Sequence, residues 1–283
     1  MHKIKKIGIV GQGFVGGSIN EFFKSRTETY TYDLNGNCNC DSLEELVQKS
    51  DLIFVCLPTP MQTDGSCDLS IVKNCINDIF NIDKHSIAII KSTVEPGTVE
   101  KLINKHGNKI IFNPEFLTEA NAIDDFNNQD RIILGGFGES LLDVESFFKK
   151  FFPKSKVVTC SPNEAEMVKY ITNTFLATKV SYANEIYDIC TSLNIDYNQL
   201  IEIFTLDKRL GFSHWSVPGP DGKRGFGGSC FPKDISALIS FASKSNIKSP
   251  LLQSVWDRNK KLDRPSKDWE LLLGRAVSKN EDS

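Results

Sequence analysis

Short apolar runs alternate with stretches of helical periodicity over roughly the first 155 residues of the chain. Apolar runs of this kind predict strands, whereas apolar residues that recur every three or four positions predict amphipathic helices. The predicted strands span 3–10, 29–32, 51–57, 86–91, 109–112 and 131–134. The predicted helices span 18–24, 42–49, 69–80, 98–106 and 139–151. This alternation predicts an α/β domain built on a doubly wound parallel sheet.

The second half of the chain has helical periodicity almost throughout. One long helix is predicted at 163–193, because Ser161-Pro162 and early acidic residues are typical of a helix start. Shorter helices are predicted at 197–204, 234–244 and 251–262. We therefore predict a sheet domain at 1–158, an all-helical domain with a long central helix at 159–265, and a C-terminal tail at 266–283 that frays at 280–283.

Length and composition fit two domains of an ordinary globular protein, with 283 residues of which 40% are hydrophobic and 24% charged. The net charge of −3 argues against a nucleic-acid partner, which usually requires a basic face. No apolar run approaches the roughly 20 residues of a membrane span. Residues 1–6 lead into a predicted strand and do not resemble a signal peptide. We expect a cytoplasmic protein that has no membrane partner.

The cysteines are expected to be free thiols, because the chain has no secretory segment that would favour a disulfide framework. The only closely spaced pair is Cys38 and Cys40, and nothing downstream supplies the second pair of ligands that a closed zinc site needs. We therefore expect no metal site. The eight cysteines are Cys38, Cys40, Cys56, Cys67, Cys75, Cys160, Cys190 and Cys230.

A glycine-rich turn of the form G-x-G-x-x-G directly follows the first predicted strand and leads into the first predicted helix. In this context Gly11 permits the tight turn, Gly13 lets the backbone approach a pyrophosphate, and Gly16 lets the helix pack on the strand. Asp33 ends the second strand, where an acid can meet the ribose hydroxyls of a dinucleotide. No arginine follows it to accept a 2′-phosphate. The sequence predicts a Rossmann domain that binds NAD in preference to NADP.

Polar residues that follow later strands are candidates for ligand contacts, because ligands bind at the carboxyl ends of the strands in such a sheet. These residues lie in Pro58-Thr59-Pro60, in Ser92-Thr93-Val94 and in the segment 113–119. Each segment also has a simpler interpretation. Proline and threonine commonly end strands, and Glu115 or Glu119 could be a solvated loop acid.

Lys169 and Asn173 are spaced to project from one face of the long helix, and Lys179 lies further along it. A solvated surface pair is the ordinary interpretation. Against it, the neighbouring residues are largely apolar, so a polar pair here is better explained by a ligand. The pair Asn184-Glu185 is interpreted as structural, either tying helices together or forming part of a subunit contact.

Cys230 follows a long glycine-rich loop and precedes Lys233 and Asp234. A cysteine beside a turn is ordinarily a buried small hydrophobe. Here Gly227 and Gly228 are expected to let the backbone approach a ligand, while Lys233 and a helix start are expected to lower the pKa of the thiol. A loop this rich in glycine and basic residues is more often a binding loop than a connector.

Taken in order, these motifs resemble those of the UDP-glucose/GDP-mannose dehydrogenase family, the nucleotide-sugar 6-dehydrogenases. The resemblance runs from Lys3 to about Asn259. It implies two successive hydride transfers to NAD, which convert a primary alcohol of a nucleotide sugar, most readily UDP-glucose, into an acid. Acids of this kind commonly feed polysaccharide synthesis. The resemblance also implies a homodimer formed through the long helix.

The resemblance assigns roles to single residues. Cys230 would add to the aldehyde, Lys169 and Asn173 would hold the oxyanion, Asp234 and Thr93 would position water, and Glu115 would act as base in thioester hydrolysis. The implied NAD contacts are Gly11, Gly13, Phe14, Val15, Gly16, Asp33, Thr59, Thr93 and Glu119. The implied sugar-nucleotide contacts are Glu115, Phe116, Leu117, Lys169, Asn173, Arg209, Phe226 and Gly227, of which Arg209 could reach a neighbouring subunit.

The family usually continues with a third, Rossmann-like domain, and this chain stops where that domain is expected to begin. Two alternatives remain open. A β-hydroxyacid dehydrogenase also pairs a Rossmann domain with a helical domain and has a lysine four residues before an asparagine, but its two-electron chemistry needs no thiol. A non-catalytic NAD-binding protein is the other alternative, and the presence of Cys230, Lys169, Asn173 and Asp234 argues against it.

Overall fold

The computed structural model describes residues 4–36 and 38–279 and divides into two compact units. The first unit contains the described residues up to Thr59 together with Leu69–Lys169. The second unit contains Pro60–Asp68 and the described residues from Tyr170 onward. The predicted boundary at residue 158 differs from this division. It falls inside a strand of the first unit, and the nine residues Pro60–Asp68 belong to the second unit although they follow a strand of the first.

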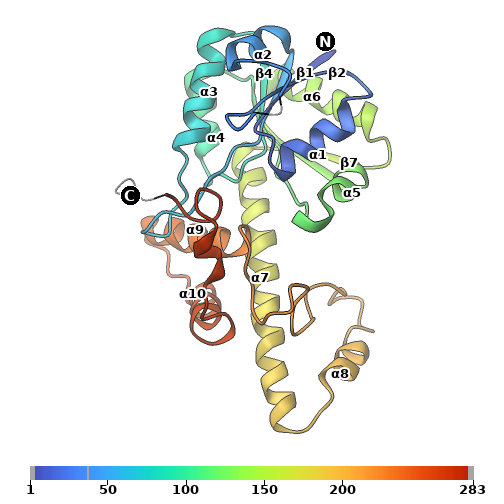
Figure 1. Ribbon diagram of the computed structural model, residues 1–283, viewed down its shortest axis with the longest axis vertical. Coiled ribbons are helices and arrows are strands. Elements are labelled where there is room, and N and C mark those ends of the chain that lie inside the picture. Colours follow the sequence, from blue (N-terminus) through green and yellow to red (C-terminus); the bar gives the residue numbers. More distant parts are fainter. Residues whose placement is uncertain (1–3, 37, 280–283) are drawn as a thin grey trace. The chain divides into compact units, whose positions relative to one another are not determined.

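The first unit is a seven-stranded sheet with helices on both faces (Figure 1). The strand order is β2-β1-β3-β4-β5-β6-β7. The strands are β1 (Lys6–Val10), β2 (Glu28–Tyr32), β3 (Leu52–Val55), β4 (Ile87–Ile90), β5 (Ile110–Phe112), β6 (Arg131–Gly135) and β7 (Lys156–Cys160). The helices are α1 (Phe14–Phe23), α2 (Leu43–Lys49), α3 (Ser70–Ile82), α4 (Thr98–His106), α5 (Ala122–Asn127) and α6 (Gly138–Phe151). The predicted Rossmann fold is confirmed.

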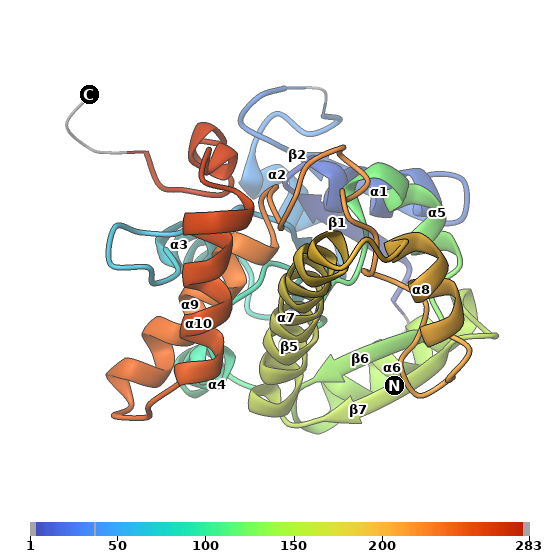
Figure 2. The same cartoon turned by 90° about the horizontal axis from the view of Figure 1, so that it is seen from below.

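Two features of the sheet differ from the prediction. Strands β5 and β6 pair antiparallel, with Phe112 opposite Gly135, so the sheet is not wholly parallel. The connection between them contains only a short 3-10 turn and the six residues of α5, and it stays at the carboxyl edge of the sheet. Strand β7 was not predicted, because as a half-exposed edge strand it lacks a continuous apolar run. It pairs in parallel with β6, and α6 packs on both (Figure 2).

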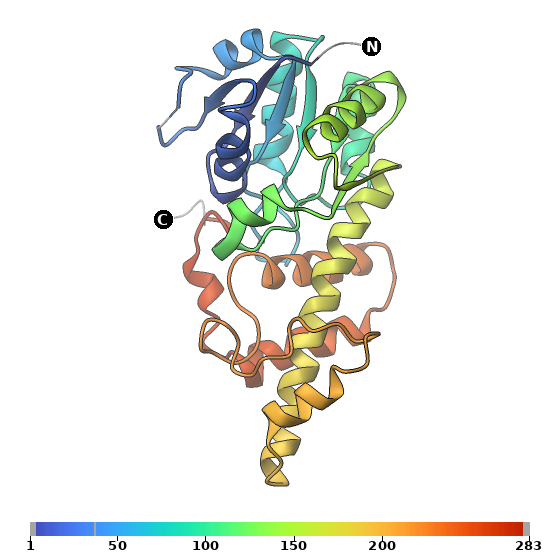
Figure 3. The same cartoon turned by 90° about the vertical axis from the view of Figure 1, so that its right-hand side faces the viewer.

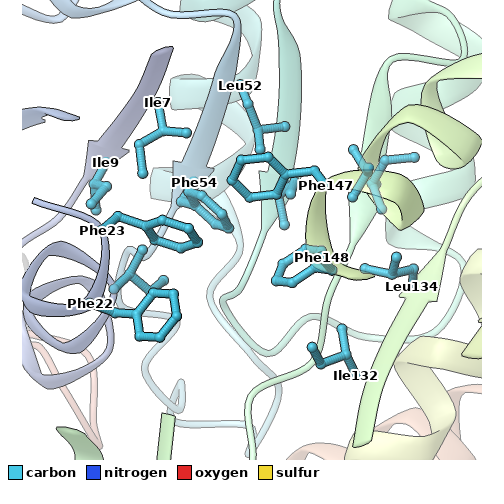
Figure 4. Close-up of a cluster of buried hydrophobic side chains, with 14 of the residues drawn as sticks. Ile7, Ile9, Phe22, Phe23, Leu52, Phe54, Ile132, Leu134, Phe147 and Phe148 are labelled. Atoms are coloured by element: carbon cyan, nitrogen blue, oxygen red, sulfur yellow. The ribbon is translucent and has the colours of Figure 1, made fainter. Parts of the chain in front are cut away.

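The core of the first unit is rich in phenylalanine. Apolar side chains from alternate positions of β1 and β3 meet Phe22 and Phe23 of α1 and Phe147 and Phe148 of α6 (Figure 4). Phe22 also stacks on Phe152, with ring centroids 4.6 Å apart. Each large side chain buried in this way contributes about 1.5–3 kcal/mol of transfer free energy. This apolar layer holds the strands whose carboxyl ends carry the polar residues predicted to act on ligands.

The second unit is mainly helical. Its elements are the C-terminal part of α7 (Pro162–Ser192), α8 (Tyr197–Phe204), α9 (Phe231–Lys244), α10 (Pro250–Arg258), a π-helix at Asn259–Asp263 and a 3-10 helix at Asp268–Leu271. The all-helical character of this part is thus confirmed. Helix α8 lies beside the end of α7 (Figure 3), where the rings of Tyr187 and Tyr197 are 5.2 Å apart.

The described part of the predicted C-terminal tail, residues 266–279, is folded and not frayed. Trp269 is 1% exposed and its ring lies 5.2 Å from that of Trp256, so this tryptophan completes the core of the second unit. Met61 donates its backbone N–H to Ala276, and Ser278 donates to Met61. Burial of the large tryptophan side chain stabilises the folded segment, whereas a solvated tail would gain no such stabilisation. Residues 280–283, for which fraying was predicted, lie outside the described residues.

Candidate active site

The turn between β1 and α1 has the geometry of a dinucleotide-binding loop. Gly11 has φ +89°, and its N–H donates to Tyr32 O at 2.9 Å. A Cβ on Gly16 would lie 1.8 Å from Gly11 O, so no side chain fits there. A Cβ on Gly13 would meet nothing within 4 Å. The loop therefore closes tightly at two glycines and leaves open space at the third, which is where a pyrophosphate would need it.

The N-terminus of α1 can accept an anion. Gly13 is its N-cap residue and supplies no side-chain cap, so the first N–H groups of the helix have no partner from that residue. Asp33 lies beside this turn, where its Oδ2 accepts from Gln12 N at 2.7 Å. Phe14 and Glu119 line the same surface groove of about 580 Å³, and Val15 packs on the core. These residues fit NAD, with Asp33 able to accept the ribose hydroxyls.

Two further predicted cofactor contacts lie at the ends of β3 and β4. Thr59 is buried, and its hydroxyl donates to Thr93 O at 2.8 Å. Ser92 is fixed to the same neighbourhood, because its hydroxyl accepts from Leu57 N at 3.0 Å and donates to Leu57 O at 2.6 Å. The structure therefore brings Thr59 and Thr93 together, with Thr93 partly exposed.

Lys169 and Glu115 form a buried ion pair in the first unit. The Lys169 ammonium donates to the backbone oxygen of Glu115 and lies 3.6 Å from its carboxylate. The carboxylate also accepts from Leu117 N. Two cations lie close to the ring of Phe116. Lys169 Nζ is 5.5 Å and Arg131 Cζ is 4.7 Å from the ring centroid. Lys169 is thus held by the segment that follows β5 and is not a solvated surface lysine.

Lys91 is a buried cation at this edge of the sheet that the sequence interpretation missed. Its ammonium donates to Asn113 Oδ1 at 2.7 Å, and Asn113 Nδ2 donates to Ile133 O at 2.8 Å. Burial lowers the pKa of Lys91 to about 8, although Glu115 nearby raises it. Burial also raises the pKa of Cys56 to about 12, which keeps that thiol neutral. A lysine that ends an otherwise apolar strand was the available signal.

Glu166 was also missed, and it closes the N-terminus of α4. Its two carboxylate oxygens accept from Gly97 N at 2.7 Å and Val99 N at 2.8 Å. Complete burial raises the pKa of Glu166 to about 7, against the opposing effect of these hydrogen bonds. The three-residue spacing from Lys169 places both side chains on one face of α7 and was the available signal.

In the second unit, Asn173, Asp234 and Lys233 form a hydrogen-bonded group next to Cys230. Asn173 Nδ2 donates to Asp234 Oδ2 at 2.6 Å, and Lys233 Nζ donates to Asp234 Oδ1 at 2.5 Å. Asp234 N donates to Cys230 O at 2.9 Å. Burial opposes the charge of Lys233, but Asp234 and the thiols of Cys67 and Cys230 outweigh it and raise the pKa of Lys233.

Helix α9 begins three residues earlier than predicted, and this change places Cys230 at the N-cap position. Pro232 is compatible with the early start, because proline is tolerated in the first turn of a helix. The positive end of the helix dipole favours negative charge at this position. Cys230 is partly exposed, and its sulfur lies 3.8 Å from the hydroxyl of Ser229.

Three of the predicted substrate contacts, Arg209, Phe226 and Gly227, are either exposed to solvent or covered by other residues of the chain. Arg209 has an 87% exposed side chain, and its guanidinium pairs with Asp207. Phe226 is buried, with its ring 6.2 Å from that of Trp256. A Cβ on Gly227 would lie 2.6 Å from Arg264 Cζ, so the space over this glycine is filled by the chain itself. Asn184 accepts from Arg224 Nε at 3.1 Å, in agreement with its structural interpretation.

Models of one protein family match both units of the chain. The NAD-binding domain of the UDP-glucose/GDP-mannose dehydrogenase family matches residues 30–151, and the central domain of the same family matches residues 163–261. The chain therefore belongs to the UDP-glucose/GDP-mannose dehydrogenase family and contains its NAD-binding domain.

Relatives with established names agree with this assignment. UDP-glucose 6-dehydrogenase from Rickettsia bellii is 37% identical over 78% of this chain and 51% of the relative. UDP-glucose 6-dehydrogenase AglM from Haloferax volcanii is 34% identical over 80% of this chain and 55% of the relative. The chain thus spans about half the length of the relatives it matches.

Solved structures agree on the fold. A UDP-glucose dehydrogenase from Pyrobaculum islandicum superposes with a TM-score of 0.78 at 28% identity, covering 89% of this chain and 67% of that one. A 3-hydroxyisobutyrate dehydrogenase from Mycobacterium tuberculosis superposes with a TM-score of 0.70 at 17% identity, covering 90% and 92%. The second likeness shows a shared fold alone. None of the helices in the described part of the chain has an apolar stretch long enough to cross a bilayer.

Proposed function

We propose that this protein is an NAD-dependent nucleotide-sugar 6-dehydrogenase that oxidises the primary alcohol of UDP-glucose to a carboxylate in two steps. The observation that carries the proposal is the group around Cys230. A partly exposed thiol at a helix N-terminus precedes by one turn a buried carboxylate that accepts from Asn173 and Lys233. A simple alcohol dehydrogenase needs no such nucleophile.

NAD, when bound, supplies the oxidising power by accepting one hydride in each of the two oxidations. The protein residues that would hold it are the glycine turn 11–16, Asp33, Thr59, Thr93 and Glu119. Gly13 leaves the space for the pyrophosphate, and Asp33 offers a carboxylate for the ribose hydroxyls. Because the two oxidations follow one another, one binding site for NAD would be sufficient.

The cysteine links the two oxidations. The thiolate of Cys230 adds to the carbonyl carbon of the aldehyde, and the carbonyl oxygen takes a proton to give a thiohemiacetal. Loss of the second hydride and the hydroxyl proton from this adduct leaves a thioester. Water then adds to the thioester carbon, the carbon–sulfur bond breaks, and the acid leaves with regeneration of the thiol. One alcohol and one water thus yield one carboxylate and two reduced cofactors.

Lys169 and Asn173 provide charge and a hydrogen-bond donor for the oxyanion that develops in each step. We assign Glu115 as the base for the hydrolytic water by its resemblance to the family motif, and its buried carboxylate lies 3.6 Å from the Lys169 ammonium. Asp234 and Thr93 position water. In the structure Asn173 Nδ2 donates one hydrogen bond to Asp234, and this bond orients the amide.

The same proposal includes a homodimer formed through α7. Four large apolar side chains of this helix are exposed in the single chain, namely Ile171 (51%), Phe175 (68%), Tyr182 (52%) and Ile189 (47%). Their spacings of four and seven residues place them on one stripe, the pattern by which helices pair. The exposure of these apolar side chains supports a partner surface on this helix.

The test is a count of reduced cofactor. The protein is mixed with a limiting amount of UDP-glucose and excess NAD, and NADH is measured against sugar consumed. Two NADH per sugar support the proposal. One NADH per sugar indicates a two-electron dehydrogenase and overturns the covalent mechanism. No NADH with UDP-glucose, but two with GDP-mannose, overturns the assigned sugar nucleotide, and none with either overturns the function.

A further inference from the structure

Asn259 holds the backbone of the loop that leads to Cys230. Its side chain is fully buried, and its Oδ1 accepts from Phe226 N at 2.9 Å while its Nδ2 donates to Phe226 O at 2.9 Å. A single amide thus satisfies both polar groups of one residue, as a neighbouring strand would. A Cβ on Gly225 would lie 2.3 Å from this Oδ1. Gly225 is therefore needed to admit Asn259.

Arg264 contacts the same loop at Gly227, the residue that follows Phe226. Its guanidinium is only 4% exposed and pairs in a bidentate manner with Asp268, at 2.9 Å from Nε and 2.8 Å from Nη2. It also donates to Asp221 and to Arg224 O, both of which belong to the loop. The guanidinium occupies the space over Gly227, three residues before Cys230.

The loop is also held at Arg224, which donates to Asn184 and pairs with Asp188 and Asp263, but its glycines leave the backbone conformationally free. Gly222, Gly225 and Gly228 all have positive φ, between +65° and +72°. Glycine at such positions gives the chain many accessible conformations, so each contact that braces the loop narrows the range it can adopt. Bidentate pairing with a planar guanidinium fixes orientation as well as distance. The bracing side chains therefore select one conformation of the segment that ends at Cys230.

We propose that Arg264 and Asn259 are positioning residues for Cys230, so that the segment following α10 is part of the catalytic scaffold. The family model ends at residue 261, and Arg264 and Asp268 lie beyond it. The proposal rests on the proposed function only in naming Cys230 as the nucleophile. Its structural content, that these two side chains control the conformation of the cysteine, is independent of substrate.

The experiment measures the reactivity of Cys230 without any substrate. The full chain and the variants Arg264→Met, Arg264→Lys and Asn259→Asp are treated with iodoacetamide, and alkylation of each cysteine is followed by peptide mass spectrometry. Asn259→Asp keeps the size of the side chain and can accept from Phe226 N, but it cannot donate to Phe226 O. Arg275→Met, at an exposed arginine of the same segment, is the matched control.

We expect Cys230 to be alkylated several-fold faster in Arg264→Met and Asn259→Asp, because the loop leaves its single conformation. Arg264→Lys is expected to fall between, since lysine keeps the charge but not the fork. Buried Cys190 serves as an internal reference and keeps its rate. With UDP-glucose and NAD, kcat is expected to fall by about 100-fold, the cost of a misplaced reacting group, while the KM for NAD is unchanged.

Unchanged Cys230 alkylation in folded variants would overturn the inference, whatever the wild-type protein does with sugars. A rise that includes Cys190 in all three variants would show that these side chains hold the whole fold and not the cysteine loop in particular, and would also overturn the inference. If Arg264→Met does not fold, the two milder variants decide the question by the same readout. A wild-type protein that produces no NADH removes the proposed function but leaves the alkylation result valid.

Discussion

The two glycine-rich loops of this protein resemble each other in sequence but differ in what occupies the space beside them. Both precede a helix, α1 in the first unit and α9 in the second. In the first loop, a Cβ on Gly13 would meet nothing within 4 Å. In the second, a Cβ on Gly227 would meet the guanidinium of Arg264. The first loop is thus open for a ligand at Gly13, and the second is filled by the protein itself at Gly227, although Gly228 next to it again has open space.

The difference shows that a glycine marks a close approach without saying what approaches. Where nothing in the chain fills the space and φ is negative, as at Gly13, replacement of the glycine should impair binding of a ligand more than stability. Where a side chain fills the space, the glycine serves the fold, and its replacement should impair stability first. Substitutions in the two loops separate these two cases, and the largest effect is expected at Cys230, which follows the second loop.

Replacement of Cys230 by serine is expected to cause the largest change. Serine is a far weaker nucleophile for the aldehyde, so turnover with UDP-glucose should fall by at least about 1000-fold, as it does when a nucleophile is removed from other enzymes. The measurement is NADH formed per sugar, which should drop below two. Cys38→Ser, at another partly exposed cysteine, is the control. Normal turnover of Cys230→Ser would rule out the covalent mechanism.

The N-terminus of α4 is a third case, because it is closed by a carboxylate from the chain. The pKa of Glu166 is raised by burial from 4.5 to about 7, so between these pH values the folded state holds a proton that the unfolded state has lost. The unfolding free energy should therefore fall as pH rises from about 4.5 to about 7, by at most about 3 kcal/mol. Glu166→Gln should remove this contribution.

The measurement is urea unfolding of both proteins from pH 4.5 to 7.5, with the difference between them plotted against pH. Glu164→Gln is a matched control on the same helix. Hydrogen bonds from Ser161 lower the pKa of Glu164, so its contribution has the opposite sign and is lost as pH falls through the lowered pKa. A pH-independent difference for Glu166→Gln would contradict the prediction.

Gly13→Ala is expected to weaken NAD binding at least tenfold and to leave the unfolding free energy unchanged within about 0.5 kcal/mol. The added methyl group enters open space and meets no protein atom, yet it stands where the backbone must approach the pyrophosphate. Titration calorimetry with NAD measures the first effect and thermal unfolding the second. Unaltered affinity would show that this space does not serve the cofactor.

Gly227→Ala should produce the reverse pattern with the smallest effect. The methyl group would press on Arg264, whose far end can shift, so the unfolding free energy should fall by about 1 kcal/mol while NAD affinity stays constant. Gly219→Ala in the same loop, where a Cβ would make only ordinary contacts, is the control. In the Arg264→Met background the cost of Gly227→Ala should shrink. Equal costs in both backgrounds would contradict the proposed contact.

Most of the first unit was predictable because its strands are continuous apolar runs and its helices are amphipathic. Helix α4 and helix α8 were predicted at their observed bounds, since Gly97 and Asp196 mark their starts clearly. Strand β7 was missed because an edge strand with solvent on one side needs no apolar run. The antiparallel β5–β6 pair was missed because strand direction depends on the path of a connection, which periodicity does not record.

In the candidate site, spacing along one helix predicted that Lys169 and Asn173 share a face, and motif order predicted the importance of Asp234. Spacing could not predict their partners. Glu115 meets Lys169 through contacts between residues 54 positions apart, and Asn173 meets Asp234 across 61 positions. Lys91, Glu166, Asn259 and Arg264 were missed for the same reason. Each acts through tertiary contacts with backbone or side chains that lie far away in the sequence.

The excursion of Pro60–Asp68 into the second unit has a consequence for how the chain acquires its structure. Met61 bonds to Ala276 and Ser278, so this segment completes its hydrogen bonds with residues more than 200 positions further along the chain. Contacts of such long sequence separation raise the contact order and slow folding. The second unit therefore cannot complete these contacts before Ser278 has been synthesised, and a cut at any single peptide bond between the units would separate one of them from one of its segments.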